Sequence, residues 1–318
     1  MYWLARYLER AEHTSRALNL TLNLLLEQRS AEAVQDRIGR LLESLSAKKP
    51  ETDLTLYDMT HLLAFDRANA ASISFCIARA RENARQIREQ ISSEMWEHLN
   101  TLYHRVMQTS LDSVWHTQTT HRFLSGVVEG AHLFQGISDS TMSHNEGWHF
   151  LQLGRYLERA NFTARFLDVQ FRELRLSRDY PAITKDFMEW VGLLKSFTAF
   201  EAYCKVYSAD LRADRILEFL VLNEEFPHTI RFSIDSAEQA LRAIDRFTET
   251  KRAGRITRLI GKLRSDLSFA QMEEIMDYGL SNYLEKLQTE CGKVHEAVIG
   301  VYISYTVERA LIAKQDAL

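Results

Sequence analysis

Two stretches of this chain place arginine and glutamate side chains at spacings that could bind an anion or move a proton. Residues 4–18 read LARYLERAEHTSRAL and residues 153–167 read LGRYLERANFTARFL, so ten of the fifteen positions are identical. The charged positions that both copies retain are Arg6, Glu9, Arg10 and Arg16 in the first and Arg155, Glu158, Arg159 and Arg165 in the second. Polar residues that recur in both copies of a repeat are the first candidates for a functional site, because an arginine fork binds carboxylates and phosphates.

Ion pairing within one helix is a weak reason for this motif to occur twice. Arg6 and Glu9 are three residues apart, and a surface pair at that spacing contributes only about 0.2–0.5 kcal/mol. One interpretation is that the two equivalent helices meet near a pseudo-twofold axis, where each glutamate bridges arginines of the other half. The alternative is that a surplus cation in each copy binds the carboxylate or phosphate of a ligand. The candidates for this cation are Arg10 or Arg16 and Arg159 or Arg165.

The elements that carry these residues are predicted to be helices. The chain has 318 residues with only three prolines and twelve glycines, so the backbone can remain helical for many turns. In the first copy the apolar residues recur on one side at helical spacing, while Arg6, Glu9 and Arg16 fall toward the other side. We therefore expect an all-α fold. The expected helices are 2–28, 31–46, 53–66, 70–90, 93–109, 118–135, 144–178, 182–207, 211–222, 228–248, 251–265 and 268–314, the last with a break near Gly292.

A weaker self-match extends the repeat beyond one helix. Residues 73–87 align with residues 230–244 at an offset of 157, whereas the first match has an offset of 149. One loop of different length explains the change in offset. The sequence therefore predicts a helical bundle of two duplicated, pseudo-twofold-related halves, at about 1–143 and 144–318, which share one core and form a single domain over 1–318.

The two copies differ in how their helices begin. Ser143 and Glu146 have capping-box spacing ahead of the second copy. Met1 aligns with Phe150, so the first copy starts inside the helix. We therefore expect that a short N-terminal piece is missing at this start and that the first helix frays at Met1.

Metal and nucleophile chemistry have less support in the sequence. The Glu-x-x-His spacing of di-iron helical bundles occurs twice, as Glu129 with His132 and Glu146 with His149. Such a site needs further carboxylates, for which Glu94 or Glu97 are candidates, but the spacing is common by chance in a chain with 11 histidines and 43 acidic residues. No metal and no other cofactor is therefore predicted. Cys204 has no adjacent histidine, and the sequence contains neither a Gly-rich phosphate loop nor a Gly-x-Ser-x-Gly elbow.

The net charge and the cysteine content indicate which partners and which cellular compartment to expect. The formal net charge is −4 with acidic and basic residues interleaved, which argues against nucleic acid or a membrane surface as a partner. No apolar run approaches the roughly 20 residues that a membrane-spanning helix needs, and no secretory signal is expected at Met1. Cys76, Cys204 and Cys291 are far apart and odd in number, which is typical of free thiols in a reducing compartment. We therefore expect a cytoplasmic protein.

The repeated motif resembles that of a known family. The residues that carry the likeness are Arg-Tyr-Leu-Glu-Arg-Ala at 6–11 and 155–160, Gly147-Trp148, and Phe134-Gln135-Gly136. A looser third Glu-Arg pair, Glu308 and Arg309, is followed by alanine like the other two. These features resemble the Alpha-E family, a bacterial all-helical domain that is named for its Glu-Arg motif and has no established reaction. The resemblance covers essentially the whole chain.

The resemblance implies a role beside other enzymes. Alpha-E genes typically lie beside those of a circularly permuted ATP-grasp ligase and a transglutaminase-like cysteine hydrolase, which look like a peptide- or amide-forming and modifying system. The leading hypothesis is an accessory component that binds a partner, or an acidic peptide or amino-acid-like ligand, near the Glu-Arg helices. The alternatives are an enzyme of the same pathway, with Glu9, Glu158 and the flanking arginines as its polar active centre, and a di-metal helical-bundle enzyme. A water-accessible cavity with a carboxylate of raised pKa beside the arginines would indicate an enzyme.

Overall fold

The computed structural model describes residues 1–26, 30–172, 187–208, 210–248 and 254–304 of the chain. Fifteen α-helices and three short 3-10 or π helices make up the regular structure of these residues, and no strand occurs among them. The prediction of an all-α fold is therefore confirmed. Within the same residues, no helix combines the length and the apolar character that crossing a membrane requires.

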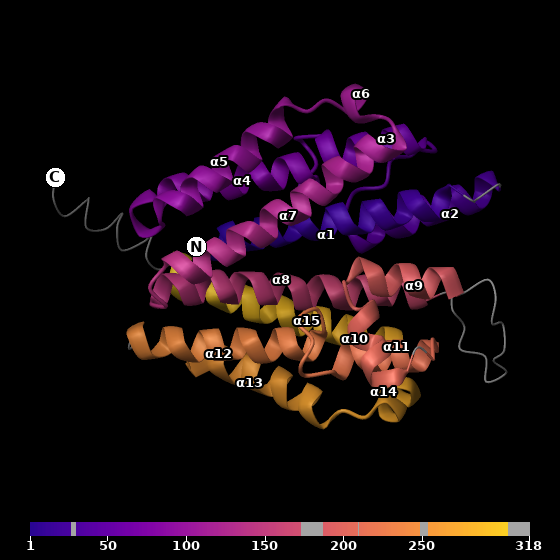
Figure 1. Ribbon diagram of the computed structural model, residues 1–318. Helices are drawn as coiled ribbons and strands as arrows, with labels where there is room; N and C mark the ends of the chain where they lie inside the picture. Colours follow the sequence, from indigo (N-terminus) through magenta and orange to yellow (C-terminus); the bar gives the residue numbers. More distant parts are fainter. Residues whose placement is uncertain (27–29, 173–186, 209, 249–253, 305–318) are drawn as a thin grey trace.

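The helices up to residue 141 lie together in the upper part of Figure 1. They are α1 (Tyr2–Leu25), α2 (Ala31–Ser44), α3 (Leu56–Thr60), the π helix η1 (His61–Phe65), α4 (Ile73–Gln86), the 3-10 helix η2 (Arg88–Gln90), α5 (Ser93–Gln108), α6 (Leu111–Val114) and α7 (Thr117–Thr141). Five of these α-helices begin where a hydroxyl side chain accepts a hydrogen bond from the first turn, which satisfies one of the free N–H groups there. The capping residues are Ser30, Thr55, Ser72, Ser92 and Ser110.

The remaining helices lie in the lower part of the same view. They are α8 (Glu146–Phe171), α9 (Phe187–Ser196), α10 (Phe200–Tyr207), α11 (Ala213–Leu222), α12 (Ile230–Thr248), α13 (Gly254–Phe269), α14 (Met272–Tyr278), α15 (Leu280–Val298) and the π helix η3 (Ile299–Ser304). The break expected near Gly292 is instead at Gly279, whose φ of 96° is a conformation that glycine adopts readily. Gly292 lies inside α15.

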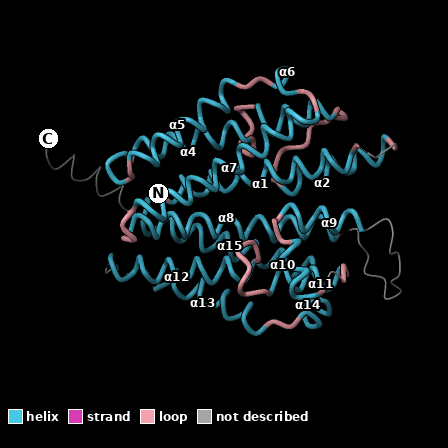
Figure 2. Tube along the Cα trace, in the orientation of Figure 1, coloured by secondary structure: helices cyan, strands magenta, loops and turns pink. Residues whose placement is uncertain are grey.

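The helices α1 and α8 carry the repeated motif and pack against each other at the centre of the molecule (Figures 1 and 2). Each is covered on its outer side by two further helices, α4 and α7 on α1, and α12 and α15 on α8. The outermost helix of each part is α5, which packs on α4 and α7, or α13, which packs on α12 and α15. The shorter helices cross over, since α2 packs against α8 and α9 against α1. One hydrophobic core therefore runs through both parts.

Several contacts occur in matching form on the two sides. The Thr14 hydroxyl donates to the Ala71 carbonyl at 3.0 Å, and the Thr163 hydroxyl donates to the His228 carbonyl at 3.4 Å. These residues correspond at the offsets of the two self-matches, 149 and 157. His13 and Phe162, which also correspond, stack on each other with ring centroids 4.1 Å apart. The duplication itself stays a prediction, although these particular pairs of corresponding residues make matching contacts.

The beginnings of the two central helices differ from the prediction in one respect. The N-cap of α8 is Asn145, whose side chain accepts from the Gly147 N–H, so the expected capping box of Ser143 and Glu146 is wrong. The preceding helix α7 runs on to Thr141, six residues beyond its expected end, which leaves a short turn. Helix α1 begins at Tyr2 with Met1 in the N-cap position and has no side-chain cap.

Candidate functional site

The charged residues of α1 are buried, although the sequence placed them opposite the apolar side. Only 7% of Arg6 and 1% of Glu9 are exposed, because α1 has neighbours on several sides and no face turned fully to water. The close approach of α8 depends on Gly154. A Cβ atom at this position would overlap the Tyr2 carbonyl oxygen, so no larger residue fits without moving one of the two helices.

Glu158 of α8 binds two arginines of α1. Its Oε2 accepts from Arg6 Nε at 2.6 Å, and its Oε1 accepts from Arg10 Nε at 2.8 Å. Burial raises the pKa of the Glu158 carboxyl, but the two guanidinium groups together outweigh burial and lower this pKa to about 2. The carboxylate is therefore charged at neutral pH and bridges two successive turns of the other helix.

Glu9 of α1 forms the reciprocal contact with α8. Arg159 donates from Nε to Glu9 Oε1 at 2.5 Å and from Nη2 to Oε2 at 3.0 Å, a bidentate pair in which both side chains are at most 2% exposed. His13 Nε2 lies 3.1 Å from Glu9 Oε1. Burial raises the pKa of the Glu9 carboxyl, and the charges of Arg159 and His13 lower it well below its usual range. Both glutamates of the motif are thus ionised and paired across α1 and α8.

The two copies do not use their first arginine in the same way. Arg6 also donates from Nη1 to His295 Nδ1 at 2.6 Å, and the Tyr2 hydroxyl lies 2.8 Å from the same nitrogen. Burial and the Arg6 charge lower the pKa of His295 to about 4, so this imidazole is neutral and acts as an acceptor. Arg155, which corresponds to Arg6, donates to the Tyr156 hydroxyl at 3.0 Å. No hydrogen bond or ion pair joins Arg155 to Glu9 among the described residues.

Arg16 has a carboxylate partner that the sequence reading did not single out. It donates from Nε to Glu12 Oε1 at 3.0 Å, and His132 Nε2 lies 3.0 Å from the same oxygen. Burial and the charge of Glu9 raise the pKa of the Glu12 carboxyl, yet the hydrogen bond from His132 and the positive charges of Arg16 and Arg159 lower it to about 2. Glu12 is fully buried. Arg16 is therefore not a surplus cation.

Arg165, the counterpart of Arg16, has no carboxylate partner among the described residues. Its Nε donates to Gln288 Oε1 at 3.4 Å, and Asn161 stands where α1 has Glu12. Burial, together with the nearby charges of Arg10 and Arg6, lowers the pKa of the Arg165 guanidinium, against the influence of Glu158. This arginine is the surplus cation that the second interpretation required.

A pocket of about 340 Å³ opens beside these groups. Its lining consists of Arg6, Arg10, His13, Leu45, Ser46, Ala70, Ala71, Glu158, Asn161, Phe162 and Arg165. It thus has three guanidinium groups and one carboxylate, a formal surplus of two positive charges among the described residues. An anion is the natural ligand for such a pocket.

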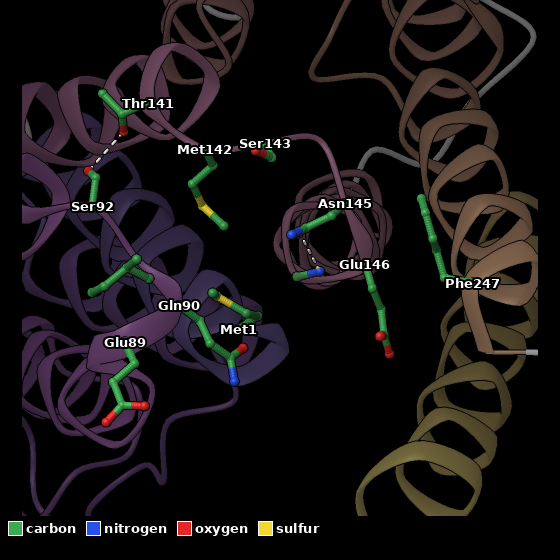
Figure 3. Close-up of a pocket in the computed structure, with 12 residues that line it drawn as sticks. Met1, Glu89, Gln90, Ser92, Thr141, Met142, Ser143, Asn145, Glu146 and Phe247 are labelled. Atoms are coloured by element: carbon green, nitrogen blue, oxygen red, sulfur yellow. Dashed lines mark hydrogen bonds between the residues drawn. The ribbon is translucent and has the colours of Figure 1, made fainter.

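Two larger pockets lie elsewhere. One of about 800 Å³ is bounded by η2, the turn between α7 and α8, Met1 at the N-cap of α1, and Phe247 (Figure 3). Its acidic side chains are Glu89 and Glu146, and Met1 lies beside them. The other, of about 640 Å³, lies along α1, α7 and α9 and includes Arg16 and His132, which are already paired with Glu12. Neither pocket exposes a surplus of arginines.

The two Glu-x-x-His pairs do not come together as metal ligands in the described part of the chain. Among these residues one other group has the required geometry: ligand atoms of Glu9, His13 and His228 lie within 4.8 Å of one another. Arg159 occupies both oxygens of Glu9, so a metal ion would have to displace a guanidinium group that is itself buried. Cys204 is partly buried against the hydrophobic core.

The structure therefore brings together most of the predicted site residues. Arg6, Glu9, Arg10, Glu158, Arg159 and Arg165 meet across α1 and α8. Arg16 lies nearly two turns beyond Arg10, and Arg155 stands apart. Glu308 and Arg309 lie outside the described residues. Sequence reasoning missed Glu12, His13, Asn161 and His295. The first three are positions at which the two copies differ, and that difference was the available signal.

Comparison with known proteins finds one family. The family model for Alpha-E, described as a predicted alpha-helical domain with a conserved ER motif, matches residues 1–303. No curated protein and no solved structure matches the chain.

Proposed function

The chain belongs to the Alpha-E family, and from this premise we propose that it is an accessory protein that binds an acidic peptide or amino-acid-like ligand in the pocket beside the Glu-Arg pairs. The observation that carries the proposal is the charge of that pocket. Arg6 and Arg10 share the single carboxylate of Glu158, and Arg165 has no carboxylate among the described residues. A ligand carboxylate would supply the missing negative charge.

The size and lining of the pocket support a small ligand. A volume of about 340 Å³ is at the lower end of the range that ligand sites occupy, roughly 300–1,000 Å³. The lining also includes the apolar or small side chains of Leu45, Ala71 and Phe162. An amino acid or the end of a peptide could place its carboxylate on the arginines and its aliphatic part against these side chains.

Binding is favoured over catalysis because the carboxylates lack the property that a general acid or base needs. A glutamate that transfers protons near neutral pH usually has a raised pKa. The pKa of Glu158 is lowered to about 2 and that of Glu9 is lowered well below its usual range, since both are ion-paired. The second candidate function, an enzyme with Glu9 and Glu158 as its active centre, would require that a bound substrate first separates these pairs.

The wider setting is also part of the proposal. The resemblance to Alpha-E supports a role beside an ATP-grasp-type ligase and a transglutaminase-like protein, with this chain presenting or holding the acidic substrate. Three free cysteines, of which Cys76 and Cys291 are buried, support a reducing compartment, and we place the protein in the cytoplasm. No nucleic acid is proposed as a partner, because the formal net charge is −4.

The test is a binding measurement on the full chain. Isothermal titration with L-glutamate, and separately with inorganic phosphate, would be compared between the wild type and Arg165→Gln. We expect the wild type to bind one of these anions and Arg165→Gln to bind it roughly 10–100-fold more weakly, since a hydrogen bond to a charged group contributes about 1.5–3 kcal/mol.

Arg85→Gln is the matched control, because Arg85 is an exposed arginine paired with Glu82 on α4, away from the pocket. This variant should bind like the wild type. Arg165→Gln should also keep its melting temperature, since Arg165 has no buried counter-charge that its loss would leave unpaired. No binding of either anion by the wild type, or equal binding by Arg165→Gln, would overturn the proposal.

A further inference from the structure

The pocket has a counterpart on the other side of the α1–α8 contact, and there the protein itself supplies the carboxylate that pairs with the arginine. The correspondence rests on three matches. Ala71 and His228 accept the same threonine hydrogen bond, from Thr14 and Thr163 respectively. Leu45 and Ser46 follow α2 as Phe197 and Thr198 follow α9, and Ser46 and Thr198 share an unusual φ of 53°.

We call this counterpart the closed side and the pocket itself the open side. On the closed side, Glu12 provides a buried negative charge. Its side chain is wholly buried and lies between Arg16 and His132. Arg159 and Arg16 face Glu9 and Glu12 there, so two arginines are balanced by two glutamates.

The bulk of this side is larger as well, since His228 takes the place of Ala71 and Phe197 that of Leu45. Burial and the charge of Arg159 lower the pKa of His228 well below its usual range, so it adds a neutral ring. The closed side therefore lacks the unpaired positive charge that a ligand would need: a pocket of about 640 Å³ does reach Arg16 and Thr198, but Arg16 is already paired with Glu12.

The open side has Arg10 and Arg165, the counterparts of Arg159 and Arg16, and Arg6 in addition, but it lacks the carboxylate and the larger side chains of the closed side. Asn161 stands at the position of Glu12 and is neutral, while Ala71 and Leu45 leave space. Arg165 stands at the position of Arg16 and has no carboxylate partner among the described residues. The pocket thus differs from the closed side chiefly in lacking a glutamate beside its last arginine, Arg165.

We propose that the ligand of the pocket presents a side-chain carboxylate on an aliphatic stem, of the glutamyl kind, and that this carboxylate takes on Arg165 the place that Glu12 takes on Arg16. The inference rests on the proposed function and makes it specific. It assigns one ligand to each chain, because the second position has its own internal occupant. It also explains why the copies differ at Glu12 and Asn161 while the arginines around them are identical.

The experiment is to give the open side the glutamate of the closed side. Asn161→Glu would place a tethered carboxylate beside Arg165, and Asn161→Gln is the control with the same length and a similar helix propensity but no charge. The probes are N-acetyl-L-glutamate α-amide, which has a side-chain carboxylate only, N-acetylglycine, which has a chain-terminal carboxylate only, and inorganic phosphate.

We expect Asn161→Glu to bind the glutamate amide at least tenfold more weakly than Asn161→Gln, which has the same side-chain length without the charge. Without ligand, Asn161→Glu should melt at least about 2 °C above Asn161→Gln, since its new carboxylate neutralises Arg165. Binding of N-acetylglycine or phosphate in place of the glutamate amide would overturn the assignment of a glutamyl carboxylate and leave an anion site in place.

The failures of this inference and of the proposed function can be told apart. If the wild type binds none of the three probes, the proposed function itself fails. If the wild type binds the glutamate amide and Asn161→Glu binds it equally well, the pocket is a ligand site but the correspondence with Glu12 is wrong. Binding of two ligands per chain would likewise refute the claim that Glu12 takes the place of a ligand on the closed side.

Discussion

Replacing Glu9 or Glu158 by glutamine removes the negative charge that faces buried arginines and leaves the side chain almost the same size. Glu9→Gln leaves Arg159 with a neutral partner at a place where both side chains are at most 2% exposed. Breaking a buried ion pair on one side costs about 3–5 kcal/mol, and we expect the upper end of this range here. The cost arises because the guanidinium group has lost its solvation and its counter-charge together.

Glu158→Gln should cost less, although it affects two arginines. The Arg10 side chain is 28% exposed and lines the pocket, so water can solvate it in part. The pKa of Glu158 falls from an ordinary 4.5 to about 2, which corresponds to roughly 3 kcal/mol of stabilisation of the charged form. We therefore expect a loss of about 3 kcal/mol in the free energy of unfolding.

Urea denaturation of both variants at pH 7.5 would measure these losses, with Glu82→Gln as the control. Glu82 pairs with Arg85 on the surface of α4, where the two side chains are 39% and 64% exposed. Its replacement should change the stability by no more than about 0.5 kcal/mol. If Glu9→Gln and Glu158→Gln both unfold within about 1 kcal/mol of the wild type, the pairs do not stabilise the contact between α1 and α8, and the reasoning from burial is wrong.

Two further predictions follow from the same region. The free energy of unfolding should fall as the pH decreases from about 6.5 to 2. The pKa of His295 is lowered to about 4 and that of Glu158 to about 2, because the fold requires a neutral imidazole and a charged carboxylate. Both contributions are therefore complete at high pH and are lost on acidification. A urea midpoint that is the same at pH 7 and pH 4 would contradict this. Gly154→Ala should destabilise the protein by about 1–3 kcal/mol, because its Cβ would meet the Tyr2 backbone. Gly261→Ala in α13, where a Cβ would contact nothing within 4 Å, should instead gain about 0.5–1 kcal/mol, and equal thermal shifts in the two variants would refute the packing argument.

Most of the helices could be predicted from hydrophobic periodicity, but several of their ends could not. The sequence predicts a helix that ends at residue 135 and another that breaks near Gly292, yet Gly136 and Gly292 both lie inside helices. A glycine costs a helix only about 1 kcal/mol, which packing of the surrounding turns outweighs. The break between α9 and α10 lies at Thr198, where φ is 53° and the sequence carries no turn signal.

The meeting of the two motifs could be predicted because both copies retain the same charges. Their burial could not, since periodicity shows which side of α1 is apolar and not how many neighbours the helix has. The role of Glu12 was missed for a different reason. The repeat draws attention to the positions at which the two copies are identical, and Glu12 is not one of them. The charge of the pocket depends on a position at which the copies differ, where one has Glu12 and the other Asn161.

Because α1 and α8 pair their arginines and glutamates with each other, neither half of the chain contains the counter-charges of all its own buried arginines. The counter-charge of Arg159 lies in the first half, on Glu9, and that of Arg6 and Arg10 lies in the second, on Glu158. Separating the halves would leave these charged side chains without their counter-charges, on surfaces that are buried in the intact protein. A boundary between residues 143 and 144 is thus a boundary of the sequence pattern alone, and we expect the two halves to melt together in one cooperative step.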